Sequence, residues 1–146
     1  MTDGTAAPFH GAKAATFIGD KLLVILRDDK PNIPYPDHWD FPGGGREGSE
    51  LGQETLAREM DEEVGLDLTE AESLHAARLP SDHRPGKMSW FFVVRFAEGT
   101  ERQIRFGDEG QRWALMSVDE VLALPNLVPS MGQRLRNWLA NEPHCP

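Results

Sequence analysis

A run of glycines that leads into an acidic helical segment is the feature that most constrains this chain. Residues 43–45 are three consecutive glycines, and residues 51–64 are rich in strong helix formers. Ser49 suits the N-cap of a helix, and Gly65 suits the position just after its last turn. The segment therefore predicts an open glycine loop that feeds the N-terminus of a helix over residues 51–64.

The acids of this predicted helix stand at separations that a helix disfavours. Glu59 lies three residues before Glu62 and four before Glu63, and like charges so placed cost roughly 0.2–0.5 kcal/mol per pair. Their carboxylates share an arc beside an apolar side made of Leu51, Thr55, Met60 and Val64. Convergent carboxylates are hard oxygen ligands, which Mg²⁺ and Mn²⁺ prefer. We therefore expect a bound cation to offset the repulsion and the metal-free protein to be the less stable form.

The remaining segments predict an α/β domain with a mixed sheet that helices cover on both faces. The proline-rich segment 28–39 interrupts the pattern and can only be an irregular loop. A capping box at Ser117 and Glu120 opens a short helix. We expect strands at 12–18, 21–27, 73–80, 87–97 and 111–116, and helices at 51–64, 117–124 and 130–142.

Length and composition set the broad class. The 146 residues fit one domain spanning 1–146, in which residues 1–8 form a loose tail. Net charge is −9 and Lys and Arg do not cluster, which argues against a nucleic-acid partner. There is no apolar run long enough for a membrane span and no signal-peptide pattern, so we expect a soluble, cytoplasmic protein. The single cysteine, Cys145, excludes a disulfide framework within the chain.

The glycine loop and helix resemble the signature of a known family. From Gly44 the order is glycine, five residues, Glu50, seven residues, and then the stretch "REMDEEVGL" at 58–66. This resembles the Nudix hydrolases at every fixed position of their motif. The resemblance implies the Nudix fold, an α/β/α sandwich with a mixed sheet and the motif loop and helix on one face. It also implies hydrolysis of a nucleoside diphosphate linked to another group, with Mg²⁺ or Mn²⁺ as cofactor.

The same resemblance assigns roles to residues. It implies that metal ions bind the motif carboxylates and one loop carbonyl, those of Glu59, Glu62, Glu63 and Gly43. Arg58 and Glu50 look like a pair that braces the loop against the helix. Glu109, in the stretch "DEGQRW", resembles an acid that MutT-like members supply from outside the motif as an extra ligand or base. Either Glu59 or Glu62 could be the general base.

The base-binding pocket lies outside the motif, and three residues are candidates for it. Asn126 falls near the place where MutT-like proteins present an asparagine to the purine edge. Phe41 could pack on the base. Arg27, at the end of the second strand, could reach a phosphate or the base.

The leading hypothesis is hydrolysis of a nucleoside triphosphate, of the oxidised 8-oxo-dGTP type among others, to a monophosphate and pyrophosphate. An ADP-ribose pyrophosphatase is the alternative, since Pro80 falls close to a proline of those enzymes. Diadenosine polyphosphate hydrolases rank lower because the only tyrosine is Tyr35, and an isoprenoid isomerase would need a cysteine in its site. From another class, the domain could be a nucleotide sensor without catalysis. A homodimer could complete the pocket.

Overall fold

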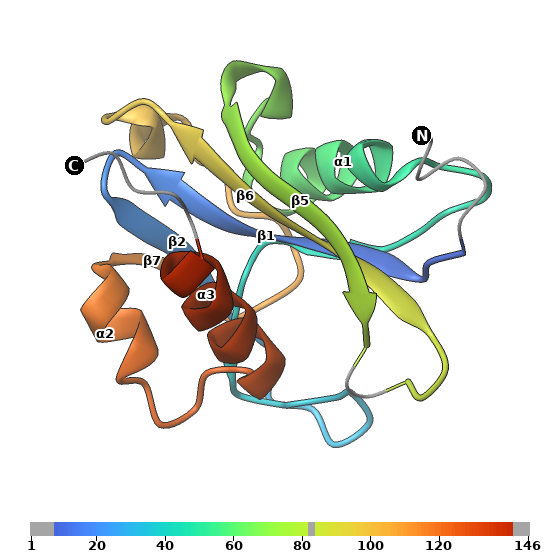
Figure 1. Cartoon of the computed structure of the whole chain (residues 1–146). Coiled ribbons are helices and arrows are strands. Elements are labelled where there is room, and N and C mark those ends of the chain that lie inside the picture. The colour runs from blue at the N-terminus through green and yellow to red at the C-terminus, as the bar shows by residue number, and fades with distance from the viewer. Residues whose placement is uncertain (1–7, 82–83, 142–146) are drawn as a thin grey trace.

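The computed structural model describes residues 8–81 and 84–141, and its centre is a seven-stranded mixed sheet (Figure 1). The strand order is β3-β2-β1-β6-β5, with β4 beside β1 and β7 beside β2. Only the β1–β6 pair is parallel among the pairings of these strands. The strands are β1 Gly11–Ile18, β2 Lys21–Leu26, β3 Trp39–Asp40, β4 Gly43–Gly45, β5 Glu72–Pro80, β6 Met88–Phe96 and β7 Arg112–Met116.

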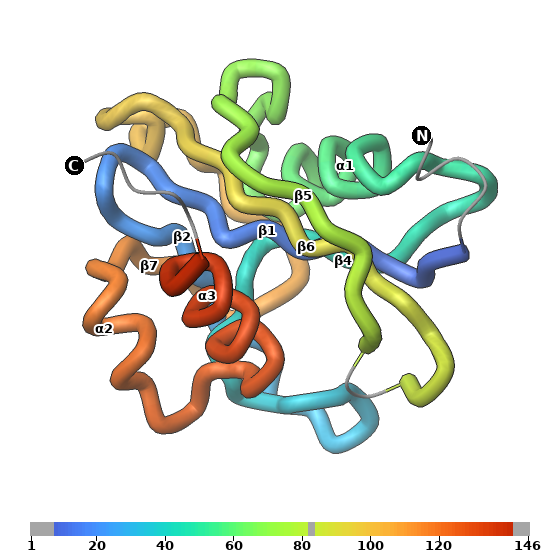
Figure 2. Tube along the Cα trace, viewed as in Figure 1, coloured from blue at the N-terminus to red at the C-terminus, as the bar shows by residue number. Residues whose placement is uncertain are grey.

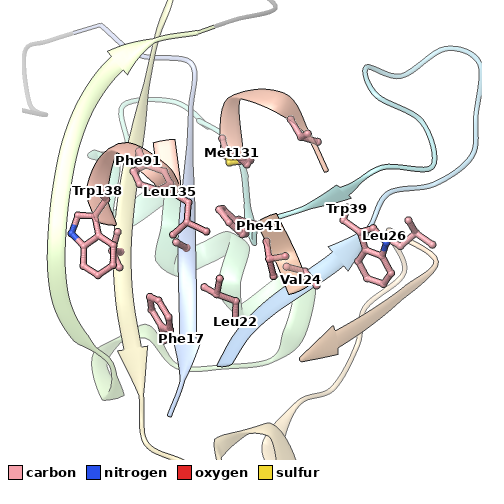
Figure 3. Packing of buried hydrophobic residues seen from close by; sticks show 14 residues of the cluster. Phe17, Leu22, Val24, Leu26, Trp39, Phe41, Phe91, Met131, Leu135 and Trp138 are labelled. Atoms are coloured by element: carbon pink, nitrogen blue, oxygen red, sulfur yellow. The ribbon is translucent and has the colours of Figure 1, made fainter. Parts of the chain in front are cut away.

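Helices cover both faces of the sheet, which confirms the predicted sandwich (Figure 2). Helix α1, Gly52–Val64, packs on one face through Leu56, Met60 and Val64. Helices α2, Val118–Leu122, and α3, Pro129–Asn141, pack on the other. Figure 3 shows this second core, in which side chains of α3 meet those of the central strands, among them Met131, Leu135, Trp138, Phe17 and Phe91.

The predicted elements are present, with shifts at their ends. The strands expected at 12–18 and 21–27, which pair as an antiparallel hairpin, and the three later strands are confirmed within one or two residues. Helix α1 begins at Gly52 with Leu51 as its N-cap, so the prediction of Ser49 as N-cap is wrong. The reason is a turn just before the helix, in which Glu50 donates its N–H to the carbonyl of Glu47 and accepts the N–H of Glu47 on its own side chain.

The other predicted helix ends are close to the observed ones. Gly65 adopts the left-handed conformation after α1, as predicted. The capping box of Ser117 and Glu120 is confirmed, although α2 ends at Leu122 and not at Leu124.

Two predictions concern residues near the ends of the chain. Residues 1–7 and Cys145 lie outside the described residues. Pro8, the last residue of the predicted tail, is exposed, and its carbonyl accepts a hydrogen bond of 3.2 Å from Arg78. Among the helices in the described ranges, none has the length and apolar content needed to cross a membrane.

Two short strands bring the glycine run onto the sheet. β3 pairs with β2, and after two residues the chain returns as β4 along β1, where Gly43 faces Lys13 and Gly45 faces Gly11. The proline-rich loop before β3 is held at its far end by Trp39, whose N–H donates to the carbonyl of Asn126. The glycine run that leads to α1 is therefore tied to β1, and the proline-rich loop before it is tied to the segment that contains Asn126.

The packing of α1 generates a prediction about stability. Met60 is fully buried at 0% exposure against the sheet, so Met60→Ala should lower the free energy of unfolding by about 2–5 kcal/mol because it leaves a cavity. Chemical denaturation measures the change. Asp61→Ala is the matched control on the exposed side of the same helix, and its effect should stay within about 0.5 kcal/mol. Equal effects of the two variants would contradict this account of how α1 is anchored.

Candidate active site

Gly43 forms a hydrogen bond through both its N–H and its carbonyl. Its N–H donates to Glu63 Oε1 on α1 over 2.8 Å, and its carbonyl accepts from Lys13 Nζ on β1 over 3.2 Å. Its φ of 139° is open to glycine, and a Cβ there would overlap the carbonyl of Ala12. Only glycine lets the loop lie this close to β1. The helix, the loop and the sheet therefore meet at one peptide.

Gly44 serves as a backbone platform for the carboxylate of Glu59. A Cβ on Gly44 would stand 2.6 Å from Glu59 Oε2, closer than atoms can approach. At Gly45, the next glycine, the nearest atom to a Cβ is the carbonyl oxygen of His10 at 3.9 Å. The requirement for glycine therefore differs sharply between these two neighbours.

Arg58 is the centre of an ion-pair network that joins the loop to the acids of α1. Its guanidinium donates to Glu50 Oε2 over 2.7 Å and to the carbonyl of Gly45 over 2.6 Å. It also donates to Glu59 Oε2 over 3.1 Å and to Glu62 Oε1 over 3.2 Å. The structure therefore places Arg58 and Glu50 in the contact expected of a brace. Arg58 also offsets part of the repulsion that the spacing of Glu59 and Glu62 implies, through ion pairs with both.

Glu50 is held as a carboxylate. The hydrogen bond from Arg58, with help from the Glu47 backbone and the hydroxyl of Thr55, lowers the pKa of Glu50 to about 2 despite an opposing effect of burial. Its Oε1 accepts from the Glu47 N–H at 2.9 Å and from the Thr55 hydroxyl at 3.0 Å. With both oxygens engaged, Glu50 stabilises the loop.

Burial acts in the opposite direction on two acids that face the glycine loop. Desolvation raises the pKa of Glu63 to about 7, against the attraction of Lys13 and the hydrogen bond from Gly43. Desolvation also raises the pKa of Glu59, although Arg58 opposes it. Glu62 is more exposed, with 56% of its side chain accessible. The three predicted metal ligands therefore have different environments on one helix.

A cluster of charges that the sequence analysis missed lies beside the loop. Asp40 is buried at 5% exposure, and its Oδ2 accepts from Lys13 Nζ at 3.0 Å and Arg27 Nη1 at 3.1 Å. Its Oδ1 accepts the N–H of Phe41 at 2.8 Å. Burial lowers the pKa of Lys13, but the charges of Asp40 and Glu63 outweigh it, so that the pKa is raised overall. A lysine inside the apolar run "GAKAATFI" is the signal that could have revealed the cluster.

Two cavities share this Lys13–Asp40–Arg27 cluster as a common wall. The first, of about 270 Å³, extends past Gly44 and Gly45 to the proline-rich loop and α3, where Tyr35, Val128, Met131, Ser89 and Arg134 line it. The second, of about 240 Å³, extends to Glu63 and Glu109. The structure therefore brings Glu109 to the same cavity as one of the motif acids.

The three predicted base-pocket residues have different positions. Arg27 lines both cavities and donates to the carbonyl of Pro34 over 2.9 Å. Phe41 is 1% exposed and packs in the core that α3 covers, and it is also among the residues that line the second cavity. Asn126 lines neither cavity and donates to the carbonyl of Asp37 over 2.9 Å, so it holds the proline-rich loop in place.

The donors around Gly43 have the chemistry of a site for a hard divalent cation. The atoms that could bind the ion are all oxygens, and the lack of a side chain at Gly44 leaves room for the Glu59 carboxylate against the backbone. As placed, no three His, Cys, Asp or Glu residues within the described ranges surround one point. Glu59 and Glu62 are turned toward Arg58, so they must turn partly away from it to hold an ion. The residues fit a metal ion on this condition.

Comparison with known proteins identifies the family. A family model described as NUDIX domain matches residues 9–138. The chain belongs to the Nudix family. An RNA pyrophosphohydrolase of Acidiphilium cryptum (strain JF-5) is 31% identical over 146 residues, with 86% of this chain and 87% of that protein covered. An 8-oxo-dGTP diphosphatase of Proteus vulgaris is 35% identical over 92 residues, with 62% of this chain and 82% of that protein covered.

Solved structures support the Nudix fold. A MutT protein from Methanosarcina mazei Go1 has a TM-score of 0.74 at 16% identity, with 95% of this chain and 99% of that chain covered. A bifunctional NMN adenylyltransferase/ADP ribose pyrophosphatase of Francisella tularensis, complexed with AMP and a Mn ion, has a TM-score of 0.68 at 19% identity. It is covered over 42% of its length, against 92% of this chain. At these identities the likeness concerns the fold alone.

Membership in the family fixes the general chemistry. This Nudix protein is a hydrolase that acts on phosphoric anhydride bonds, and the family acts on small nucleotide substrates. Nudix enzymes in general use divalent metal ions. The resemblance of the motif at 44–66 is therefore confirmed at the level of family and fold.

The glycine platform generates a paired prediction. Gly44→Ala should push the carboxylate of Glu59 out of place and lower turnover by about 100-fold or more, since misplacement by roughly 1 Å has effects of this size. Gly45→Ala, with open space around the new methyl group, is the matched control and should keep turnover close to that of the unsubstituted Nudix protein. Steady-state kinetics with a common nucleotide substrate measures both. Similar losses in the two variants would contradict the platform.

The raised pKa of Glu63 predicts how metal-free stability depends on pH. The unfolded chain releases this proton near pH 4.5 and the folded chain near pH 7, so stability should fall as pH rises through this window. Glu63→Gln should remove that loss, giving a variant more stable at pH 8 by about 1–3 kcal/mol. Denaturation with EDTA from pH 4.5 to 8 measures it, with Glu62→Gln as the exposed control. Parallel pH profiles for Glu63→Gln and the unsubstituted protein would exclude this role for burial.

Proposed function

We propose that the protein hydrolyses a nucleoside triphosphate to a nucleoside monophosphate and pyrophosphate with Mg²⁺ or Mn²⁺. One observation carries the proposal: the two cavities meet at Lys13, Arg27 and Asp40, so that a partly apolar pocket adjoins a carboxylate-lined one. A nucleotide has the same division into an apolar, flat base and a charged phosphate chain. The cluster at the boundary contains the two cations that a phosphate chain would need.

The base would occupy the first cavity. Tyr35 and Met131 offer apolar and aromatic surface to a flat ring, and Ser89 and Arg134 offer polar atoms to its edge. Arg134 is buried and donates to Ser89 Oγ over 3.0 Å and to the carbonyl of Pro80 over 2.9 Å. Two donors with fixed positions suit recognition of carbonyl groups on a purine, including one added by oxidation. This supports 8-oxo-dGTP as a member of the substrate class.

The phosphates would lie over the glycine loop, between the cationic cluster and α1. Arg27 and Lys13 point their charges at this boundary, where they share one carboxylate oxygen. The carbonyl of Gly43 and the carboxylates of Glu59, Glu62 and Glu63 would hold the metal ion. Glu109, on the second cavity with Glu63, would be an additional ligand.

The reaction needs a proton acceptor and stabilisation of negative charge. When bound, the metal ion supplies electrostatic stabilisation of the phosphate oxygens and activates water as a nucleophile. Glu59 or Glu62 accepts the proton as the water oxygen forms its bond to phosphorus. The bond from that phosphorus to the bridging oxygen breaks, and pyrophosphate leaves with the electron pair. Arg58, which contacts both glutamates without metal, would stay beside them as they turn partly away from it to hold the ion.

A second candidate substrate is the triphosphorylated 5′ end of RNA. The relative named RNA pyrophosphohydrolase, which aligns over 86% of this chain, favours it. The net charge of −9 and the absence of a cluster of Lys and Arg in the sequence speak against a grip on an RNA backbone. ADP-ribose remains an alternative, although Pro80, the residue that suggested it, ends β5 and accepts from Arg134. A sensor without catalysis would not need the complete set of motif glutamates.

A panel of substrates tests the proposal. Purified protein with Mg²⁺ or Mn²⁺ is given dGTP, 8-oxo-dGTP, other nucleoside triphosphates, ADP-ribose and a 5′-triphosphorylated RNA oligonucleotide, and the products are resolved by chromatography. We expect a nucleoside monophosphate and pyrophosphate from a nucleoside triphosphate. Glu62→Gln should lower this turnover by several orders of magnitude, whereas Asp61→Asn, the exposed control on the same helix, should not.

The outcomes distinguish the candidates. Cleavage of RNA or ADP-ribose without cleavage of free triphosphates would replace the proposed substrate with that one. No turnover with any member of the panel would favour the sensor. Turnover that persists in Glu62→Gln would contradict the role given to the motif acids.

A further inference from the structure

Lys13 makes contacts beyond those that its proposed place beside the phosphates requires. It stands in β1 with apolar neighbours on both sides, and its ammonium group is partly buried, with 23% of the side chain exposed. Nζ lies 3.2 Å from the Gly43 carbonyl and 3.0 Å from Asp40 Oδ2. The negative charge of Glu63 also acts on it. A positive charge from the protein itself therefore sits on the carbonyl proposed to bind the metal ion.

We propose that Lys13 is an internal counter-cation that competes with the divalent ion for the Gly43 carbonyl, so that metal binding must displace its ammonium group. The inference rests on the proposed metal site. It assigns to Lys13 the role of a positioning residue that sets the affinity of the site for metal.

The competition follows from distances and charge. A divalent ion of this kind binds oxygen at roughly 2.1 Å, so an ion on the Gly43 carbonyl would lie within a few ångströms of Nζ. Two positive groups so close repel each other strongly where water is largely excluded. The lysine stem is flexible, and Asp40 offers an anchor that remains after the carbonyl is lost. Nζ can therefore leave Gly43 and stay paired with Asp40.

The same contacts explain why a lysine is present. Without a metal ion, the charge of Asp40 raises the pKa of Glu63, while Lys13 pairs with Asp40 and attracts Glu63. Arg27 neutralises the charge of Asp40 in part, through an ion pair with Oδ2. Lys13 is placed to neutralise the region between the two acids. It thus holds the loop in its bound shape before any metal ion arrives.

Isothermal titration of MnCl₂ into the protein, with no nucleotide present, tests the inference. Lys13→Met should bind Mn²⁺ at least about tenfold more tightly than the unsubstituted protein, because a like charge is removed from the site. In EDTA it should melt at a lower temperature than the unsubstituted protein, and added Mn²⁺ should raise its melting temperature by more. Lys21→Met is the control: it removes the same charge at the exposed start of β2, where Lys21 pairs with Ile18 at the far end of β1.

Lys13→Gln is the second variant, in case Lys13→Met does not fold, because it keeps a hydrogen-bond donor for Gly43 and Asp40 but removes the charge. It should also bind Mn²⁺ more tightly. Binding by the unsubstituted protein with equal or weaker binding by both Lys13 variants would overturn the role of Lys13 and leave the metal site standing. No binding by any of the proteins would overturn the proposed metal site and the inference with it. Tightening in Lys21→Met as large as in Lys13→Met would reduce the effect to net charge and also overturn it.

Discussion

Two hydrogen bonds at Gly43, one from its N–H and one to its carbonyl, are the constraint on which the rest of the site depends. One reaches Glu63 on α1, and the other comes from Lys13 on β1. The core beneath α1 fixes the distance of the helix from the sheet, but these bonds fix its carboxylates relative to the loop. Since Gly44 then passes directly under Glu59, any side chain at this point would separate the acids from the backbone. The glycine run is therefore required by the approach of a helix to a strand.

Charge balance in the site is achieved by side chains that a ligand can replace. Arg58 forms ion pairs with Glu50, Glu59 and Glu62. Lys13 forms an ion pair with Asp40 and is also attracted by the charge of Glu63. The repulsion that the spacing of the acids implies is thus reduced within the protein itself. A divalent ion would not simply fill a preformed cage but would exchange with these cations. Its affinity would then reflect a difference between two sets of interactions, which lets the protein fold before it is loaded.

Local patterns predicted most of the fold and the part of the site carried by consecutive residues. The hairpin, the strands and the helices follow from periodicity and turn residues, and the contact between Arg58 and Glu50 follows from fixed spacing in the motif. Ser49 is not the N-cap because the side chain of Glu50, the next residue, accepts the N–H of Glu47 and so stabilises a competing turn. The cluster around Asp40 was not predictable in this way, because Lys13 lies in β1, Arg27 just after β2 and Asp40 in β3, and they meet only through sheet pairing.

The positions of Phe41 and Asn126 bear on where specificity for the base would be set. Phe41 precedes the glycine run in sequence and belongs to the core on the α3 side, and Asn126 donates a hydrogen bond to the proline-rich loop. The outer wall of the first cavity comes from this loop and from α3. The motif carboxylates to which the proposal gives the chemistry lie on α1, which packs on the face of the sheet opposite to α3. Substitutions in the loop or α3 can therefore alter the recognised base while the catalytic helix and its glycine loop stay unchanged, which is how one hydrolytic scaffold can accommodate different nucleotides.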